Sequence, residues 1–187
     1  MMTATGPTAA AVGRQRNRKI MQNSWVVTDI GAAMQHWVRT AGIGPFFVVK
    51  GLTLDDQCYR GKPAAKSIEV TFALAQAGDI QIELVEQHND VKSAYRDLIA
   101  AGRSGFHHMA LYSDDYDADL ADYTRAGFEV AFSGAFAGKR FCYVDTSASI
   151  GCMMELIEAS DAQAGFFSKI IAAAIDWDGS DPIRPAF

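Results

Sequence analysis

Short strand-like stretches and one segment with apolar residues at helical spacing predict a first unit of several strands and one helix. This unit begins near Met21. Residues 25–28 are rich in β-branched and aromatic side chains, as is typical of a strand. In residues 30–40 apolar side chains recur at helical spacing, so one face of a helix can pack on a sheet. Asp29 suits the N-cap of this helix and Gly42 its end. We expect further strands at residues 46–49, 68–75 and 80–86, and a loop at the polar residues 53–66.

A second unit repeats this order of elements. Residues 108–112 predict a strand, residues 115–125 a helix closed by Gly127, and later residues three more strands, at 128–132, 141–144 and 152–158. A connecting helix is expected at residues 89–101, where the apolar side chains share one side. The predicted fold class is α+β, with two tandem β-α-β-β-β modules forming a curved mixed sheet and a C-terminal helix. We expect a flexible tail at residues 1–19, modules at 20–88 and 105–160, the connection at 89–104, and a C-terminal helix and tail at 161–187.

A repeated phrase supports an internal duplication. Ile82–Glu86 reappears in similar form as Met154–Glu158, and each copy follows a strand-like segment that ends in an aspartate. The upstream segments begin at Gln22 and His108, with Asp29 and then Asp115 seven residues later. Each half therefore contributes two side chains that can bind a metal ion.

Strand alternation predicts where these four side chains point. If Ile82 and Leu84 face the helices, Glu83 faces a cavity on the opposite side of the sheet, and the same holds for Glu155. Gln22 and His108 fall on the matching face of their strands. Carboxylate, imidazole and amide ligands suit one divalent ion, with Zn first and Ni, Co, Mn or Fe as alternatives. Any one of these residues alone is better explained as an ordinary strand polar group, but the repeated spacing favours a metal site of the catalytic type.

Composition and charge exclude several classes of protein. The chain has 187 residues, of which 49% are hydrophobic, and a net charge of −5, which argues against nucleic-acid binding. No stretch approaches the roughly 20 apolar residues needed to span a membrane, and no secretory signal is evident, so we expect a cytoplasmic protein. The three cysteines are expected to be reduced. The basic run at residues 14–19 is interpreted as part of a mobile tail, with an RNA- or partner-binding arm as the alternative.

These segments, together with the Gly105–Ala110 phrase, resemble the vicinal oxygen chelate superfamily, which includes glyoxalase I, methylmalonyl-CoA epimerase and the bleomycin resistance proteins. The resemblance covers roughly residues 20–160. It implies that Gln22, Glu83, His108 and Glu155 are the metal ligands, a set similar to that of zinc-type glyoxalase I. Many members have histidine where this chain has Gln22, which leaves the subfamily open and makes a ring-cleaving dioxygenase less favoured.

The expected activity is that of a divalent-metal-dependent isomerase, epimerase or lyase. The substrate, a small molecule or an acyl-CoA-type compound, would bind the metal through a carbonyl oxygen. The carbon next to this carbonyl group would lose a proton, and the metal would stabilise the resulting enolate. By the resemblance, Glu155 is the first candidate for the base. Glu69 is the second, because alternation along residues 68–74 predicts that it faces the cavity. The alternative function is a metal-free small-molecule binding protein of the antibiotic-sequestering kind.

Other residues have weaker expected roles. Arg60, Lys62 and Arg140 lie in predicted turns, where they could hold an anionic substrate group at the cavity mouth or simply be solvated, and Tyr112 is a further substrate-binding candidate. His107 is expected to be a structural histidine. The apolar residues 166–177 predict a helix that forms either a lid over a bulky apolar or acyl-CoA substrate, or the contact of a homodimer.

Overall fold

The computed structural model describes residues 18–187, so the expectations for the tail lie almost entirely outside the described residues. The first unit consists of β1 (Ile20–Val26), α1 (Ile30–His36), β2 (Phe46–Val49), β5 (Val70–Ala77) and β6 (Ile80–Gln87). The Asp29 side chain accepts a hydrogen bond from the Ala32 amide and caps α1, as predicted. The helix continues as a π-helical segment, η1 (Trp37–Ala41), and ends at Gly42, whose φ of +66° lies in the left-handed region.

The second unit repeats the arrangement with β7 (Gly105–Ser113), α3 (Tyr116–Arg125), β8 (Val130–Phe136), β9 (Lys139–Val144) and β10 (Met153–Glu158). The short helix α4 (Ser147–Ile150) lies between β9 and β10, and another, α2 (Ala94–Leu98), lies in the connection between the two units. Beyond β10 follow α5 (Asp161–Ala174) and a short edge strand, β11 (Ile183–Pro185).

The connection between the units is less helical than predicted, because α2 is a single short helix. The Gln87 side chain donates to the backbone carbonyls of Asn89 and Val91, which holds residues 89–92 as a loop. Ser93 then caps α2 by accepting from the Arg96 amide.

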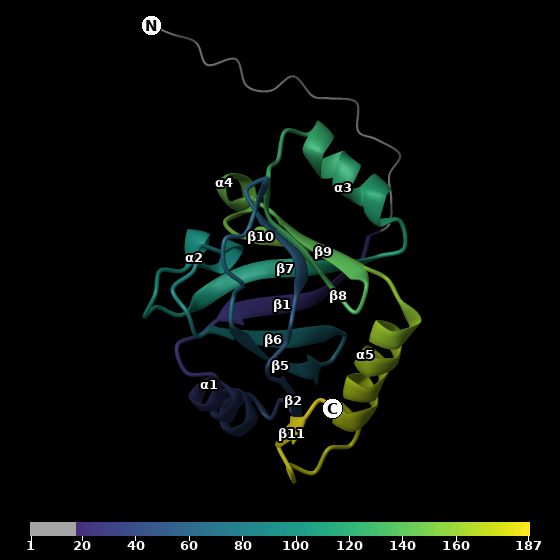
Figure 1. The fold of residues 1–187 in the computed structure, drawn as a ribbon. Helices are drawn as coiled ribbons and strands as arrows, with labels where there is room; N and C mark the ends of the chain where they lie inside the picture. Colours follow the sequence, from purple (N-terminus) through teal and green to yellow (C-terminus); the bar gives the residue numbers. More distant parts are fainter. Residues whose placement is uncertain (1–17) are drawn as a thin grey trace, which may run out of the picture.

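The strands form one curved, unclosed mixed sheet in the described part of the chain, in the order β11-β2-β5-β6-β1-β7-β10-β9-β8-β3-β4 (Figure 1). In each unit the first and last strands pair in parallel, β1 with β6 and β7 with β10. The antiparallel pairing of β1 with β7 joins the two units at the middle of the sheet. The four strands that carry the predicted ligands are therefore neighbours.

Residues 53–66, predicted to be a loop, contain the strands β3 (Asp55–Tyr59) and β4 (Lys62–Pro63), so that prediction is wrong. β3 leaves the first unit and pairs with β8, at the far edge of the second. The turn after β3 is fixed by Arg60, whose backbone amide donates to Ala131 O and whose guanidinium binds Asp97 and Asp145, each at 2.8 Å. These partners are distant in sequence, so the polar composition of the segment did not reveal its strands.

The helices α1 and α3 pack on the outer face of the sheet, as the alternation predicted. Ile82 and Leu84 are buried in one cluster with Ile30 and Met34 of α1. Met154 and Leu156 of β10 are buried beside Tyr116 of α3 in another. The odd-numbered side chains of β6 and β10 therefore face the inside of the curved sheet. None of the helices in residues 18–187 is long and apolar enough to cross a membrane.

Candidate metal centre

Three of the four predicted ligands converge inside the curved sheet. Glu83 on β6, His108 on β7 and Glu155 on β10 are buried, and each offers a ligand atom within 4.8 Å of the others. The His108 Nε2 atom lies 3.3 Å from Glu83 Oε2 and 3.2 Å from Glu155 Oε2. All three groups belong to one chain, so this cluster needs no second subunit.

The register of the parallel strand pairs explains the convergence. Gln22 is opposite Gln81, and Glu83 comes two residues further along β6. In the second unit His108 is opposite Met153, and Glu155 comes two residues further along β10. Because side chains two apart share a face of the sheet, each half delivers its pair of ligands to the same side.

Gln22, the fourth predicted ligand, lines the same cavity as Glu83 and Glu155. Its Nε2 donates to Gln81 Oε1 at 2.6 Å, so its carbonyl oxygen is the free end of the amide. Ser24, two residues further along β1, donates to Glu83 Oε2 at 2.8 Å. Gln81 and Ser24 thus orient the ligand groups of the first half of the site.

His107 fixes the protonation of the ligand histidine. Its Nε2 lies 2.9 Å from the Ala94 carbonyl oxygen, which can only accept, so Nε2 carries the proton and donates. Its Nδ1 is therefore the acceptor in the 2.9 Å contact with His108 Nδ1, and His108 donates there. A neutral His108 consequently has its lone pair on Nε2, between the two glutamates. This is the tautomer that a metal ion requires.

Burial and the short distances between His107, His108 and the two glutamates shift the pKa values of these side chains. Burial lowers the pKa of His107 to about 3, helped by the neighbouring His108, which keeps His107 neutral. Burial also lowers the pKa of His108, but Glu155 and Glu83 outweigh it and raise that pKa from 6.5 to about 9 when no metal ion is bound. Burial raises the pKa of Glu155, against the opposing effect of His108. A cation is needed between these groups, either a proton or a metal ion.

Two unpartnered atoms indicate that the residues fit a metal ion. Among the side chains of residues 18–187, Gln22 Oε1 is a buried acceptor without a hydrogen-bond partner, and the lone pair of a neutral His108 Nε2 would face only the acceptor oxygens of Glu83 and Glu155. Leaving such an atom unpaired in the interior costs about 1–3 kcal/mol. Together with the two carboxylates they form the nitrogen and oxygen donor set that divalent transition metals bind.

The cavity over these ligands has a volume of about 140 Å³. Its floor is polar, while its walls are apolar side chains from β2, β5, β8, β9 and α5. Two tyrosines stand beside the carboxylates, with the Tyr95 and Tyr143 hydroxyl groups 2.8 Å apart. An interaction with Tyr143 opposes the rise in the pKa of Glu155. The site can therefore hold a small apolar molecule against a cation and a carboxylate base.

Glu69 does not reach this cavity. It is exposed and precedes β5, where its backbone amide bonds to the Asn89 side chain. The expected alternation along this strand is wrong, because Phe72 and Leu74 line the cavity and Ala73 packs toward α1. Leu74 is paired directly with Glu83, so the residues of β5 that share the ligand face are the even-numbered ones.

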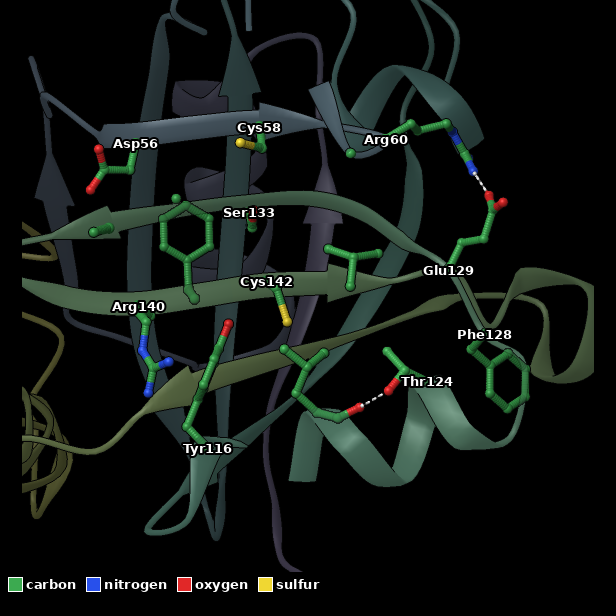
Figure 2. Close-up of a pocket in the computed structure, with 16 residues that line it drawn as sticks. Asp56, Cys58, Arg60, Tyr116, Thr124, Phe128, Glu129, Ser133, Arg140 and Cys142 are labelled. Carbon is green, nitrogen blue, oxygen red and sulfur yellow. Dashed lines mark hydrogen bonds and ion pairs between the residues drawn. The ribbon is translucent and has the colours of Figure 1, made fainter. Parts of the chain in front are cut away.

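The predicted substrate-binding cations also lie outside the cavity. Arg60 and Arg140 line an outer groove of about 730 Å³ beside α3, on the opposite face of the sheet (Figure 2). Arg140 binds Asp117 and Glu158 and stacks on the Tyr116 ring, while Lys62 is exposed on β4. Each arginine already has carboxylate partners. Figure 2 shows Arg60 reaching Glu129 at one end of the groove and Arg140 at the other.

Tyr112 lies on the ligand face of β7 but holds a helix in place. Its hydroxyl group donates to the Ser160 carbonyl at 2.7 Å and accepts from the Ser160 amide at 2.8 Å, and its ring contacts Phe167. Ser160 is the N-cap of α5. Tyr112 therefore fixes the start of the helix that covers the cavity.

Four groups that support the candidate ligands had no role predicted from the sequence, namely Ser24, Gln81, Tyr95 and Tyr143. Alternation from Gln22 and Glu83 places Ser24 and Gln81 on the cavity face, so that signal was present in the sequence. Tyr95 comes from α2 and meets Tyr143 of β9 across the interior. Nothing in the sequence pattern links these two.

Comparisons with known proteins agree with this architecture. A family model described as the Glyoxalase/Bleomycin resistance protein/Dioxygenase superfamily matches residues 21–143. No curated protein matched in a sequence search. Solved structures similar in fold include a variant of Streptomyces coelicolor methylmalonyl-CoA epimerase in complex with 2-nitronate-propionyl-CoA, with 20% identity, a TM-score of 0.54, and coverage of 76% of this chain and 95% of that one.

A methylmalonyl-CoA epimerase in complex with methylmalonyl-CoA and ammonium gives the same identity of 20% and TM-score of 0.54, covering 77% of this chain and 96% of its own. A hypothetical protein from Bacillus halodurans C-125 is 17% identical, with a TM-score of 0.53 and coverage of 78% and 97%. These likenesses show the fold, and the family model spans more than half of the sequence. The resemblance to the vicinal oxygen chelate proteins is thus confirmed, and the chain belongs to the Glyoxalase/Bleomycin resistance protein/Dioxygenase superfamily.

Proposed function

We propose that this protein is a divalent-metal-dependent isomerase, epimerase or lyase that removes a proton from a carbon next to a carbonyl group. One observation carries the proposal. The Nε2 atom of His108 lies between the buried carboxylates of Glu83 and Glu155, and the unpartnered Gln22 Oε1 belongs to the same cavity lining. Buried polar groups of this kind destabilise a hydrophobic core, whereas their nitrogen and oxygen atoms are suitable ligands for a divalent metal ion.

Gln22, Glu83, His108 and Glu155 would hold the ion, with Zn²⁺ as the first candidate. A bound divalent cation would polarise the substrate carbonyl and stabilise the negative charge that develops on its oxygen. His107, Gln81 and Ser24 hold three of the ligand groups in their binding orientation. Such outer contacts are commonly worth 10- to 100-fold in metal affinity.

Glu155 is the proposed base, and among the residues that line the cavity only it and Glu83 are carboxylates. The substrate C–H bond breaks, the proton moves to a Glu155 oxygen, and the electron pair remains on the substrate. Return of the proton to the other face or to a neighbouring atom gives an isomer, and departure of a leaving group gives a lyase product. In the metal-free site burial raises the pKa of Glu155. A Glu155 oxygen that is not bound to the ion would be the proton acceptor.

Metal analysis of the purified protein tests the binding half of this proposal. We expect close to one divalent ion per chain in the wild type, and a loss in His108→Gln and Glu83→Gln. Glu158→Gln is the matched control, because Glu158 lies on β10 but bonds to Arg140 on the outer face. Normal folding without any bound metal would instead support the sequestering type of binding protein.

Solvent-deuterium exchange tests the chemistry. The metal-loaded protein should exchange the proton next to the carbonyl in a member of a panel of α-hydroxy ketones and acyl-CoA thioesters. The acyl-CoA compounds are included because epimerases that bind them share this fold. Glu155→Gln at saturating metal should slow exchange by roughly 100-fold or more. Exchange at the wild-type rate in this variant would exclude Glu155 as the base.

A further inference from the structure

The walls of the cavity limit what can lie over the ligand cluster. Above the polar floor, they are built from aliphatic and aromatic side chains such as Val49, Leu74, Phe136 and Phe167. Neither lysine nor arginine is among the residues that line the cavity. Apart from the ligand groups, its polar side chains are two tyrosines and Gln163, which are neutral.

Three cations near the cavity have partners elsewhere. On α5, Lys169 bonds to the Ala186 carbonyl and lies over the Phe47 ring. Arg60 and Arg140 belong to the outer groove and bind carboxylates. A second anionic group on a bound molecule would therefore be buried against apolar walls without a counter-charge, which is costly.

The size of the cavity sets the second limit. Its volume of about 140 Å³ is close to that of a cavity of about 150 Å³ known to bind benzene. Phe166 and Phe167 on α5 close one side, and Phe187 packs on Phe166 with ring centroids 5.5 Å apart. The space above the ligands thus fits one six-membered ring or a branched alkyl group of similar volume.

We infer that the part of the substrate that enters this cavity is a compact, uncharged apolar group, a phenyl ring or branched alkyl chain, attached to the carbonyl group that would meet the ion. The inference rests on the proposed function, since that carbonyl oxygen would lie at the ion. The apolar group would contact the walls and the carbonyl oxygen would face the polar floor. A carboxylate or phosphate on the entering group is excluded.

Inert hydroxamates test this inference, because they present two neighbouring oxygens to a divalent ion without reacting. Calorimetric titration of the zinc-loaded protein should show benzohydroxamate binding at least about tenfold more tightly than acetohydroxamate, which lacks the ring. It should also bind at least about tenfold more tightly than para-carboxybenzohydroxamate, whose extra charge meets the apolar wall. Naphthohydroxamate should be similarly disfavoured by size. Equal affinities across the series would overturn the inference.

A matched pair of variants on α5 tests the role of charge. Gln163 lines the cavity and is partly exposed, so Gln163→Arg places a cation at the wall with little effect on packing. This change should strengthen binding of the carboxylated probe relative to benzohydroxamate by about tenfold, the size of one charge-assisted hydrogen bond. Ala164→Arg adds the same charge at an exposed neighbouring position and should leave this relative affinity unchanged. An equal change in the affinity for the carboxylated probe in both variants would contradict the assignment of Gln163 to the cavity wall.

A measurement without metal separates this inference from the proposed function. Ligand-observed NMR with the chelator-treated protein should show acetophenone binding at least about tenfold more tightly than benzoate. If zinc does not bind but this preference holds, the proposed function fails and the inference about the cavity stands. If zinc binds but both compounds bind equally well, the proposed function stands and the inference fails.

Discussion

At the scale of single residues, the sequence pattern predicted the convergence of three candidate ligands. Strand alternation and the repeated spacing placed Glu83, His108 and Glu155 on one face, and the structure brings them together. Glu69 was misplaced because alternation gives only two choices of face, and nothing local decides between them at the start of a strand. The role of His107 could not be predicted from the local pattern, since it depends on the carbonyl of Ala94 at the start of α2.

His107 should control metal affinity without touching the ion. In His107→Ala, His108 loses the acceptor for its Nδ1 proton and can adopt the tautomer that puts a proton on Nε2. We expect zinc affinity to fall by roughly 10- to 100-fold. Calorimetric titration measures this effect, and His107→Gln, which keeps an acceptor, should recover part of it. Unchanged affinity in the alanine variant would show that the contact does not orient the ligand.

The metal-free protein should become less stable as pH rises. The pKa of His108 is raised from 6.5 to about 9 by the two glutamates, so its contribution to stability is complete below 6.5 and is lost as pH rises through about 9. The melting temperature measured with a chelator should therefore fall across this interval, whereas zinc, which replaces the proton, should remove the fall. His36→Gln, at an exposed position of α1, should show the wild-type profile. A flat profile without metal would contradict this assignment.

At the scale of elements, helix and strand periodicity predicted both units, whereas the connections were the weak point. The hairpin β3–β4 was not predicted because its residues are polar and its pairing partner β8 is distant in the sequence, with Cys58 paired to Ser133. The apolar residues of α5 predicted a helix that packs on another surface, and in the structure this surface is formed by β2 and β5. Ile170 is buried on β2 and β5, and Phe166 and Phe167 face the cavity.

Tyr112→Phe tests whether Tyr112 acts on this helix rather than on a substrate. The change removes both hydrogen bonds between the tyrosine hydroxyl and the Ser160 backbone, at a cost of about 1–2 kcal/mol in the free energy of unfolding. Amide exchange at the start of α5 should become faster while zinc affinity stays the same. Tyr123→Phe on α3 is the control. Unchanged exchange in α5 together with weaker probe binding would instead assign Tyr112 to the substrate.

At the scale of the whole molecule, the duplication predicted from a five-residue phrase accounts for the symmetry of the site. Each half contributes one parallel pair of strands, and the ligands of the two halves meet across the β1–β7 pairing. The sequence did not show that both halves would deliver their ligands within one chain, because the same repeat is compatible with a shared site in a dimer.

A metal ion held by both halves should stabilise the entire fold. At a free zinc concentration of 100 times the dissociation constant, the expected gain is about 2.7 kcal/mol in the free energy of unfolding. Thermal unfolding with zinc and with chelator should show this gain in the wild type and in Glu158→Gln. Glu83→Gln removes a ligand and should largely abolish it. An equal gain in Glu83→Gln would place the zinc elsewhere.

The crossing hairpin has a consequence for how the protein can assemble. Residues 55–63 leave the N-terminal half and add the last two strands beyond β8, so the halves are interlocked as well as adjacent. Two copies that exchanged halves would have to pull this hairpin free and rebuild it on the other molecule. Such exchange, an accessible route to dimers for many duplicated proteins, is thereby hindered, and each polypeptide is expected to complete its own centre even at high dilution.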